Sequence, residues 1–383
     1  MSRNDKTATI TFHNSYNCGS MLQALALQKV LIDKYGVDNE ILDFSNQGQK
    51  EMYSIFWKVT GFKSFIKNAL WSTVYKRIKQ QAAAYEAFEH KYFCLSQDTY
   101  TSNKELTATN SKYQKFITGS DQVWNIRCMD ADDAYYLNFV SDFNRRYAYA
   151  VSFGANNPFA DSSLKDHYLN LVNKFNKISV REQNAKKWVS TATGREVSLC
   201  VDPTMLLSQG EWEKTVQLGS APIIQGDYIF YYCFSISQEI ASFLHQVSKK
   251  TGMPVYFFEP KEWALRCCWK NKIRLVKKYG PEAFLNYMKY AKMVFTTSFH
   301  GTAFSTIFHK NFWYIDSGHN DLSKDDRAVS FLTQLKLTDR YKTISSLLQT
   351  DLSLIPDYTQ PDQALAKLRE EAFEYIEGIV NDR

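Results

Sequence analysis

The sequence predicts an α/β protein made of two doubly wound domains. Short runs of β-branched and aromatic residues, such as residues 8–12 and 293–295, alternate with longer segments whose apolar residues recur at helical spacing. This alternation is typical of parallel sheets whose strands are joined by helices. The chain has 383 residues, which is more than one hydrophobic core usually supports, so we expect two such units.

The opening segment predicts a β-α-β unit. We expect strands at residues 8–12 and 40–44, joined by an amphipathic helix at residues 21–34. The turn after the first strand lies where open α/β sheets bind ligands, and contact with a polar substrate competes there with simple turn chemistry. The candidate contact residues in this turn are Tyr16, Asn17, Gly19 and Ser20. The turn lacks G-x-G-x-x-G, so a dinucleotide is not indicated.

Residues 47–113 interrupt the alternation with a long, largely helical pattern. Aromatic and basic side chains are mixed in it: Phe56, Trp57, Lys58, Phe62, Lys63, Phe65, Lys67, Trp71, Tyr75, Lys76, Arg77 and Lys79. A basic helix with an aromatic face can lie in a membrane interface, which makes residues 52–79 a candidate for peripheral membrane contact. The same pattern suits a helical insertion whose aromatic rings pack on the sheet edge while its lysines are solvated.

A second polar turn follows the strand expected at residues 113–118. It reads Gly119-Ser120-Asp121-Gln122-Val123-Trp124-Asn125. A helix N-cap would explain one of these polar residues. A carboxylate, two amides and an indole together suit a site that grips a hydroxylated ring by hydrogen bonds and stacking. Further strands are expected at residues 145–153, 177–180 and 198–201, which makes about six in the first sheet.

The second sheet is expected after a linker at residues 208–227. Its strands would be residues 228–234, 254–258, 292–297 and 311–315. Helices are expected at residues 325–335 and 361–380, and the second of these would pack back across the first domain.

The stretch at residues 296–304 reads as a turn from strand to helix. Gly301 would let the backbone approach a ligand, and the start of the helix favours an anion. His300 is the only titratable side chain between Met293 and His309, so proton chemistry in this turn would use His300. The alternative is an ordinary turn histidine whose hydrogen bonds are satisfied.

Composition excludes several classes of protein. The seven cysteines are scattered and form no C-x-x-C pair, which favours reduced thiols and predicts neither a disulfide framework nor a metal site. The formal net charge of +6 suits acidic small molecules or an anionic membrane surface and is too diffuse for nucleic acid. No apolar run reaches membrane-spanning length and no signal peptide is visible, so we expect a cytoplasmic protein, with the inner face of the plasma membrane as a further expectation.

Six motifs in order resemble the polysaccharide pyruvyl transferase family over almost the whole chain. They occupy residues 17–28 (NCGSMLQALALQ), 116–125 (FITGSDQVWN), 147–154 (YAYAVSFG), 178–182 (ISVRE), 201–207 (VDPTMLL) and 298–304 (SFHGTAF). Residues 325–340 resemble the closing segment of the family. Each motif alone is weak, and their common order makes the match specific.

The resemblance implies a fold and an activity. It implies two Rossmann-like domains facing a cleft, as in GT-B glycosyltransferases. It divides the chain into an acceptor-side domain at residues 1–207 with the insertion 47–113, a donor-side domain at 208–360, and a closing helix at 361–383. The implied reaction moves a pyruvyl group from phosphoenolpyruvate to sugar hydroxyls of a cell-surface or exopolysaccharide repeat unit, with no cofactor. The implied partners are phosphoenolpyruvate and a glycan or lipid-linked oligosaccharide, without nucleic acid.

The resemblance also suggests roles for residues. His300 matches the family histidine of the second domain, and Arg181 matches an arginine implicated in donor binding. Together with Ser298, Gly301, Thr302 and Arg327, Arg181 forms the expected donor site, and His300 with Asp121 the expected catalytic pair. The family often has Arg-Leu-His where this chain has Ser298-Phe299-His300, and Arg327 could replace the missing cation. The expected acceptor site comprises Tyr16, Asn17, Gly19, Ser20, Gly119, Ser120, Gln122, Trp124 and Asn125.

Two alternatives to pyruvyl transfer stay open on the sequence. One is a glycosyltransferase that uses a nucleotide sugar in the same cleft, which the serine at position 298 favours slightly. The other is a non-catalytic glycan-binding component of a polysaccharide assembly system.

Overall fold

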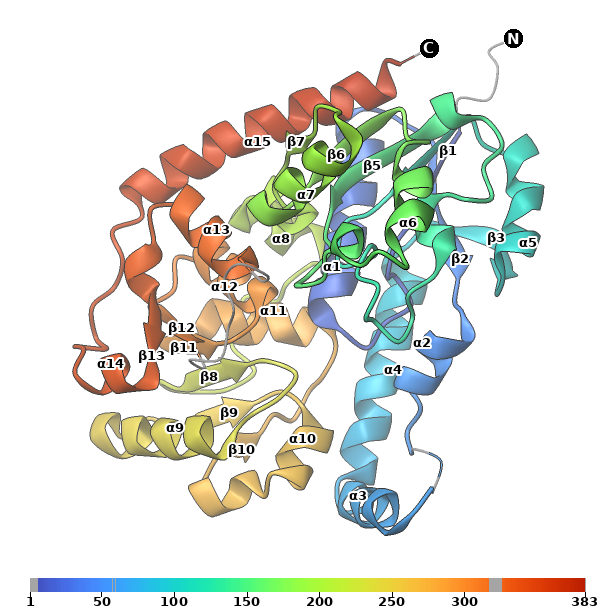
Figure 1. Ribbon diagram of the computed structural model, residues 1–383. Coiled ribbons are helices and arrows are strands. Elements are labelled where there is room, and N and C mark those ends of the chain that lie inside the picture. Colours follow the sequence, from blue (N-terminus) through green and yellow to red (C-terminus); the bar gives the residue numbers. More distant parts are fainter. Residues whose placement is uncertain (1–5, 57, 59, 317–325, 383) are drawn as a thin grey trace.

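Two parallel β-sheets organise the chain, and a computed structural model describes residues 6–56, 58, 60–316 and 326–382 (Figure 1). Trp57 and Asp325, which belong to segments discussed above, lie outside the described residues. Every strand pair in both sheets is parallel, and helices flank the sheets. The predicted α/β class with two doubly wound, GT-B-like domains is therefore confirmed.

The N-terminal sheet has the strand order β3-β2-β1-β4-β5-β6-β7. Its strands are β1 (Thr7–Ile10), β2 (Asn39–Phe44), β3 (Leu95–Tyr100), β4 (Lys115–Thr118), β5 (Arg146–Val151), β6 (Lys177–Val180) and β7 (Ser198–Leu199). The helices of this half are α1 (Cys18–Lys29), α2 (Gln47–Met52), α3 (Phe62–Ser72), α4 (Tyr75–Tyr92), α5 (Asn103–Leu106), α6 (Lys165–Val172), α7 (Gln183–Thr193) and α8 (Gln209–Thr215).

The C-terminal sheet has the order β10-β9-β8-β11-β12-β13. Its strands are β8 (Ile229–Tyr232), β9 (Val255–Phe257), β10 (Arg274–Leu275), β11 (Met293–Thr296), β12 (Phe312–Asp316) and β13 (Tyr341–Thr343). The helices are α9 (Gln238–Thr251), α10 (Pro260–Leu265), α11 (Pro281–Tyr290), α12 (Phe299–Ile307), α13 (Arg327–Gln334), α14 (Ile344–Leu348) and α15 (Thr359–Val380).

Three edge strands were not predicted from the sequence. Strand β3 reads LSQDTY, and Gln97, Asp98 and Thr99 are exposed. It therefore lacks the apolar run that identifies a buried strand. Strands β10 and β13 are two and three residues long, too short for any periodicity to be visible. The expected linker at residues 208–227 also contains a helix, α8, which Ser208 and Glu211 start with a capping box.

Helix α1 differs from its predicted character. The sequence predicts an amphipathic helix, but every residue from Cys18 to Gln28 is buried. The reason is that α1 packs against α11 and the turn Pro203–Leu206 as well as its own sheet, and one apolar cluster includes Leu22 and Leu25 of the first domain with Phe284 of the second. The polar side chains of α1 are therefore buried too and form hydrogen bonds inside the protein. Gln23, for example, donates a hydrogen bond to Thr11 Oγ1 over 2.8 Å.

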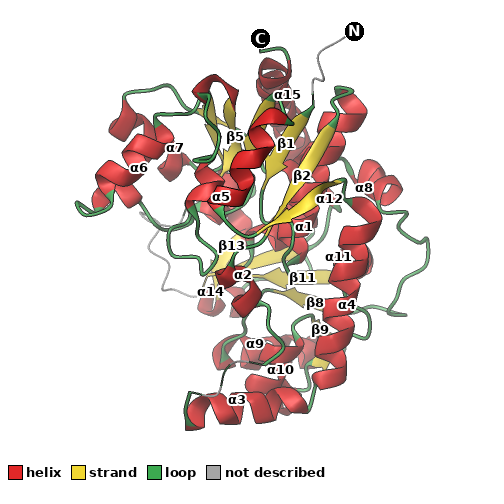
Figure 2. Cartoon of the chain, turned by 90° about the vertical axis from the view of Figure 1, so that its right-hand side faces the viewer, coloured by secondary structure: helices red, strands yellow, loops and turns green. Residues whose placement is uncertain are grey.

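The last helix, α15, runs from the C-terminal domain across the N-terminal one (Figure 1), and Figure 2 shows it behind the N-terminal sheet. Tyr375 Oη donates a hydrogen bond to the carbonyl of Ala148 over 3.0 Å, and Lys177 Nζ donates one to the carbonyl of Gly378 over 2.6 Å. These bonds hold α15 beside strands β5 and β6. No helix among the described residues is both long and apolar enough to cross a membrane.

Candidate functional site

The topology of each sheet marks one point for ligand binding. In the first sheet the strand order reverses between β1 and β4, and in the second between β8 and β11. The crevice outside the carboxyl ends of the strands at such a reversal is where open α/β sheets bind ligands. Residues 13–20 and 119–125 follow β1 and β4, and residues 297–301 follow β11. The motifs singled out in the sequence therefore lie at both reversal points.

Asp202 connects the two domains at this position. Its carboxylate is fully buried and accepts a hydrogen bond from Arg181 Nη1 over 2.5 Å. The same oxygen, Oδ2, lies 3.4 Å from His300 Nε2, on the first turn of α12 in the other domain. The other oxygen, Oδ1, accepts hydrogen bonds from the backbone N–H and hydroxyl of Thr204.

The electrostatics of Asp202 follow from these neighbours. Burial by itself would raise the pKa of Asp202, but the charge and hydrogen bonding of His300 and the charge of Arg181 hold that pKa below its ordinary value. Asp202 is therefore ionised, and its negative charge orients the imidazole of His300. Nε2 of His300 is buried and points at Asp202 Oδ2, so the carboxylate fixes the orientation of the ring.

Gly19 supports the imidazole from the opposite domain. A Cβ atom at this position would lie 2.1 Å from His300 Nδ1, so any side chain would collide with the ring. Asn17 places the glycine by capping α1, since its side chain accepts hydrogen bonds from the N–H groups of Gly19 and Ser20. The start of α1 and the start of α12 thus meet at His300.

Asp121 is linked to the same network. Its Oδ2 accepts a hydrogen bond from the Ser20 hydroxyl, and its Oδ1 lies 3.7 Å from Arg181 Nη2. The backbone of Asp121 has φ = 69°, a conformation that is uncommon for residues other than glycine and clusters at functional sites. The structure therefore brings together Arg181, Asp121 and His300, which lie far apart in the sequence.

Arg181 is enclosed on all sides. Its guanidinium stacks on the ring of Phe299 with 4.4 Å between Cζ and the ring centroid, and only 3% of its side chain is exposed. Nε lies 3.9 Å from a carboxylate oxygen of Glu182. Glu182 is itself fully buried, and burial raises its pKa to about 7 against the lowering effect of Arg181.

A cavity of about 330 Å³ opens beside Asp121. It is lined by both domains, with Tyr16, Asn17, Ser20, Asp121 and Gln122 from the first and Phe234, Glu259 and Lys261 from the second. Residues of the insertion, including Met52, Tyr53, Ile55, Ile78, Gln81 and Ala82, close another side. The cavity therefore collects four of the nine residues that the sequence suggested for the acceptor: Tyr16, Asn17, Ser20 and Gln122.

Carboxyl groups dominate the charge of this cavity. Besides Asp121 it contains Glu259, whose pKa burial raises to about 7, and Asp130, whose pKa burial raises to about 6. Lys261 is the one basic residue among the described lining residues, and its Nζ is engaged with the carbonyl of Ser54. Carboxyl and amide groups form hydrogen bonds with sugar hydroxyls, and ionised carboxylates repel a phosphate, so this cavity suits a neutral polar ligand.

Several expected acceptor contacts are corrected by the structure. Trp124 is fully buried, stacks on Tyr136 with 4.9 Å between ring centroids, and donates Nε1–H to the carbonyl of Tyr135, so its indole has no face for a sugar. Ser120 is also fully buried and bonds to the carbonyl of Ala150. Gly119 is interior, and Asn125 bonds to Gln122 and Asn156 beside the cavity. These residues shape the turn that presents Asp121.

The expected donor contacts are partly structural as well. The Ser298 side chain caps α12 by accepting from the Gly301 N–H, and Thr302 is fully buried with its hydroxyl bonded to the carbonyl of Ser298. Gly301 is required by packing, since a Cβ there would lie 2.1 Å from Thr296 Oγ1. Arg327 is half-buried at the start of α13, where its charge acts on Glu182.

Three acidic residues of the site carry no role in the sequence interpretation. Asp202 belongs to the VDPTMLL motif, in which the sequence interpretation assigned no role to a side chain. Glu259 comes two residues after β9, so the rule that places ligands at carboxyl ends of strands could have identified it. Asp130 follows no strand and belongs to none of the six motifs, so no pattern in the sequence identifies it.

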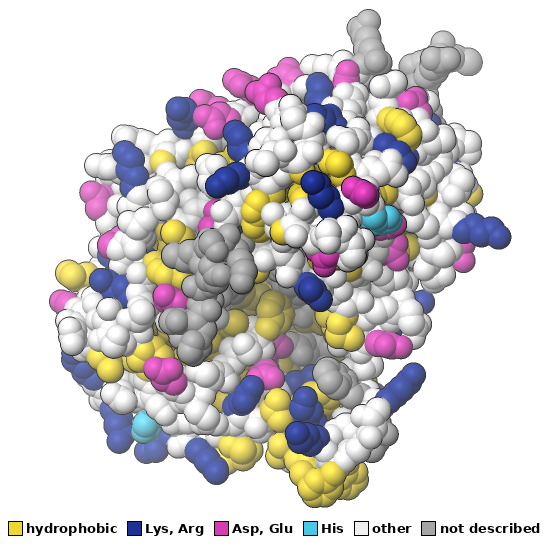
Figure 3. Space-filling view, in the orientation of Figure 1, with side chains coloured by type: hydrophobic (Ala, Val, Ile, Leu, Met, Phe, Trp, Pro, Cys, Tyr) yellow, Lys and Arg dark blue, Asp and Glu magenta, His cyan; other side chains and the backbone are white. Residues whose placement is uncertain are grey.

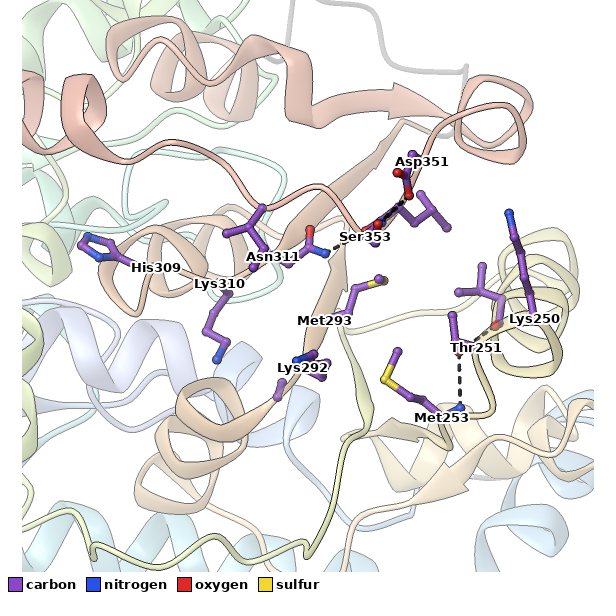
Figure 4. Close-up of a pocket in the computed structure, with 14 residues that line it drawn as sticks. Lys250, Thr251, Met253, Lys292, Met293, His309, Lys310, Asn311, Asp351 and Ser353 are labelled. Atoms are coloured by element: carbon purple, nitrogen blue, oxygen red, sulfur yellow. Dashed lines mark hydrogen bonds between the residues drawn. The ribbon is translucent and has the colours of Figure 1, made fainter.

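A second cavity, of about 460 Å³, lies at the opposite edge of the C-terminal sheet (Figure 4). Met293 begins β11, Asn311 directly precedes β12, and Met253 lies two residues before β9, so this cavity is at the amino ends of the strands. None of its lining residues belongs to the network around Asp202. This second cavity is therefore not part of the site at the carboxyl ends of the strands.

Solved structures with the same architecture include sugar-nucleotide enzymes. A putative UDP-N-acetylglucosamine 2-epimerase from Listeria monocytogenes has a TM-score of 0.54 at 7% identity, with 98% of this chain and 96% of that chain covered. MnaA of S. aureus, solved with UDP, has a TM-score of 0.54 at 10% identity, covering 99% and 98%. At such identities the likeness shows the fold alone, and the fold and cleft define a protein of the GT-B class.

The family follows from the sequence itself. A model of the polysaccharide pyruvyl transferase family matches residues 17–320. This chain belongs to the polysaccharide pyruvyl transferase family, as its six motifs suggested. No match is found among curated proteins.

Replacing Gly19 by alanine should displace His300. Because the new Cβ would overlap the imidazole, we expect an unfolding free energy lowered by about 1–3 kcal/mol, as for other overpacked sites. A crystal structure of Gly19→Ala should show His300 Nε2 moved away from Asp202. Gly210→Ala is the matched control, since nothing lies within 4 Å of that position. An unmoved imidazole with full stability would contradict the contact.

Replacing Glu182 by glutamine should change how stability depends on pH. The pKa of Glu182 is raised in the folded protein to about 7 from an ordinary 4.5, so the unfolded chain loses this proton first as the pH rises. The wild type therefore loses stability between about pH 4.5 and 7 relative to Glu182→Gln. Thermal unfolding of both proteins from pH 4 to 8 tests this, and a constant difference in midpoint would refute the assigned pKa.

Proposed function

We propose that the protein transfers a pyruvyl group from phosphoenolpyruvate to two hydroxyls of a sugar in a cell-surface or exopolysaccharide repeat unit, forming a pyruvate ketal. The observation that carries the proposal is the network of His300, Asp202 and Arg181 at the meeting point of the two domains, in a chain of this family. The network joins an imidazole held by a carboxylate to a buried cation, the groups that acid–base chemistry on an anionic donor requires.

The reaction balances without an oxidant or reductant. One sugar hydroxyl adds to C2 of the donor and a second displaces the phosphate from the same carbon, so two C–O bonds form and the C–O bond to phosphate breaks. Of the two hydroxyl protons, one ends on the methylene carbon, which becomes a methyl group, and the other leaves with phosphate. We expect no cofactor, since phosphoenolpyruvate already has the oxidation state of pyruvate.

The donor would lie against the start of α12. N–H groups at a helix start and a positive dipole end attract phosphate. Positive charge would come from Arg181, whose guanidinium stacks on Phe299 at the start of α12, and from Arg327 at the start of α13. In this arrangement His300, oriented by Asp202, would deliver the proton to the donor.

The acceptor would occupy the cavity beside Asp121. This carboxylate is fixed by Ser20 and has no proton to donate when ionised, so it can take the proton of the attacking hydroxyl. Tyr16, Asn17 and Gln122 are expected to bind other hydroxyls of the glycan. Glu259, with a pKa near 7, is a further group that could exchange a proton with the second hydroxyl.

Replacing His300 by alanine should lower turnover with phosphoenolpyruvate by about 10²–10⁴, the usual contribution of a general acid–base. The measurement is phosphate release together with mass spectrometry of the glycan product. His309→Ala is the matched control, because His309 is exposed and pairs with Asp362 over 2.9 Å outside the cleft. Full activity of His300→Ala would remove His300 from the mechanism.

A nucleotide sugar is the second candidate donor, because a structure of similar fold was solved with UDP. Calorimetry with phosphoenolpyruvate and with UDP separates the two. Binding of UDP and no phosphate release from phosphoenolpyruvate would replace the proposal by glycosyl transfer. Glycan binding without turnover on either donor would indicate a non-catalytic component.

We also propose that helix α3 contacts an anionic membrane, where a lipid-linked acceptor would be found. The inner side of α3 packs through Trp71 on Ile78 and Ala264, whereas Phe62, Phe65 and Ile66 are exposed on its outer side. In the space-filling view, hydrophobic side chains gather at the tip formed by this helix, with basic side chains beside them (Figure 3).

Charge supports a membrane over a protein partner for this tip. The sequence has no Asp or Glu between Glu51 and Glu86, and the basic residues of that stretch are Lys58, Lys63, Lys67, Lys76, Arg77 and Lys79. Each basic residue near an anionic surface contributes about 1 kcal/mol, and exposed aromatic rings insert at the interface. The same insertion lines the acceptor cavity, so a lipid-linked glycan could pass from the membrane to Asp121. This contact would place the enzyme at the cytoplasmic face of the plasma membrane.

Replacing Phe62, Phe65 and Ile66 by serine should abolish co-sedimentation with vesicles containing phosphatidylglycerol. Binding of the wild type should weaken as the salt concentration rises, because charge contributes to it. Leu354→Ser with Ile355→Ser is the control, since these residues form an equally exposed apolar pair in the C-terminal domain. Equal sedimentation of the triple variant and the wild type would exclude α3 as the contact.

A further inference from the structure

Three potential metal ligands meet behind the cavity, outside the network around Asp202. His13 follows β1, Asp43 lies on β2 and Glu89 lies on α4. His13 Nε2 is 3.3 Å from Asp43 Oδ1 and 3.7 Å from Glu89 Oε1, and all three ligand atoms lie within 4.8 Å of one another. His13 is fully buried and Glu89 is 91% buried, given its exposed fraction of 9%.

The distances from His13 Nε2 to the two carboxylate oxygens fit a cation with tetrahedral coordination. Zinc bonds to imidazole nitrogen and carboxylate oxygen are about 2.0–2.2 Å long, which puts adjacent tetrahedral ligands about 3.4 Å apart. The two distances from His13 Nε2, 3.3 and 3.7 Å, lie on either side of this value. The three side chains could therefore bind one ion without moving far.

The hydrogen bonds around the cluster orient its ligands. His13 Nδ1 lies 3.3 Å from the carbonyl oxygen of Thr11, which only accepts, so Nδ1 carries the proton and Nε2 faces the two carboxylates. Asp43 Oδ2 accepts a hydrogen bond from the Thr99 hydroxyl over 2.7 Å, which leaves Oδ1 toward His13. A backbone carbonyl that holds the second ring nitrogen of a histidine, and a hydrogen bond to the second oxygen of a carboxylate, are outer contacts typical of metal ligands.

One oxygen of the cluster stays unsatisfied without an ion. Glu89 Oε1 is buried, points at His13, and has no hydrogen-bond partner among the described residues. A protonated His13 could donate its single Nε2 proton to the nearer Asp43 but would leave Glu89 unpaired. A buried carboxylate without a partner is costly, whereas a divalent ion would match both carboxylates and the imidazole lone pair.

We propose that His13, Asp43 and Glu89 bind a divalent transition-metal ion, with Zn²⁺ as the best match. Imidazole together with carboxylates suits Zn²⁺, while Mg²⁺ prefers an all-oxygen shell. The ion would tie α4 to strands β1 and β2, and α4 supplies Ile78, Gln81 and Ala82 to the cavity wall. Its role is structural: it holds the insertion against the sheet.

The sequence expectation of no metal site depended on spacing. The three ligands lie in separate segments and form no short motif, so only the packing of α4 over β1 and β2 brings them together.

Calorimetry of chelator-treated protein with Zn²⁺ alone tests the proposal. We expect saturable binding of one equivalent and a higher thermal midpoint, with no response to Mg²⁺ at the same concentration. Glu89→Gln and Asp43→Asn should each lose that binding while keeping the shape of the side chain. Metal analysis of protein purified without chelator should find the ion in the wild type and not in Glu89→Gln.

The matched control is His309→Asn, which removes a histidine that pairs with one carboxylate only. This variant should bind Zn²⁺ as the wild type does, which would show that the binding does not come from this surface histidine. Two results would overturn the proposal: no saturable Zn²⁺ binding by the wild type, or binding that Glu89→Gln and Asp43→Asn leave unchanged.

Discussion

The ion contacts of Asp202 hold the functional part of this molecule together. This buried carboxylate bonds to Arg181 in its own domain and faces His300 in the other, so separating the domains would remove the imidazole and leave Arg181 as its charged neighbour. Removing one partner of a buried ion pair lowers the free energy of unfolding by more than the intact pair contributes to it. The relative position of the two domains is therefore part of the site. Gly19 reinforces this constraint, because only a residue without a side chain admits the imidazole at that distance.

The two parallel sheets explain why the chemistry gathers at this place. Each sheet reverses its strand order once, and the loops leaving the carboxyl ends at the two reversals face each other. The charges differ between the two parts of this space: Asp202, Arg181 and the start of α12 lie around His300, while carboxyl groups line the neighbouring cavity. An anionic donor and a neutral glycan would therefore meet at Asp121 and His300 from different sides. The insertion closes one side of this cavity and carries the exposed aromatic tip of α3.

Much of the fold could be predicted from the sequence, because buried parallel strands and the helices between them leave periodic apolar patterns. The six motifs also identified the family and the turns that form the cleft. The errors have physical causes. Trp124 was expected to stack on a sugar because polar residues flank it, but its indole is buried in the core. Helix α1 reads as amphipathic, yet the second domain covers its other face. Asp202 lies in one of the six motifs but received no role, because its importance comes from contacts with two residues that are distant in sequence.

The sequence by itself determined the α/β class, the two doubly wound units, the family and the turns in which His300, Arg181 and Asp121 lie. These properties are local, since strand and helix periodicity and turn chemistry are set by residues that are near in sequence. Only the tertiary structure decided that Asp202 joins Arg181 to His300, that Glu259 and Asp130 line the cavity, and that His13, Asp43 and Glu89 converge. Such contacts join residues from separate segments, and burial, which changes their pKa values and hydrogen bonding, exists only once the whole chain is packed.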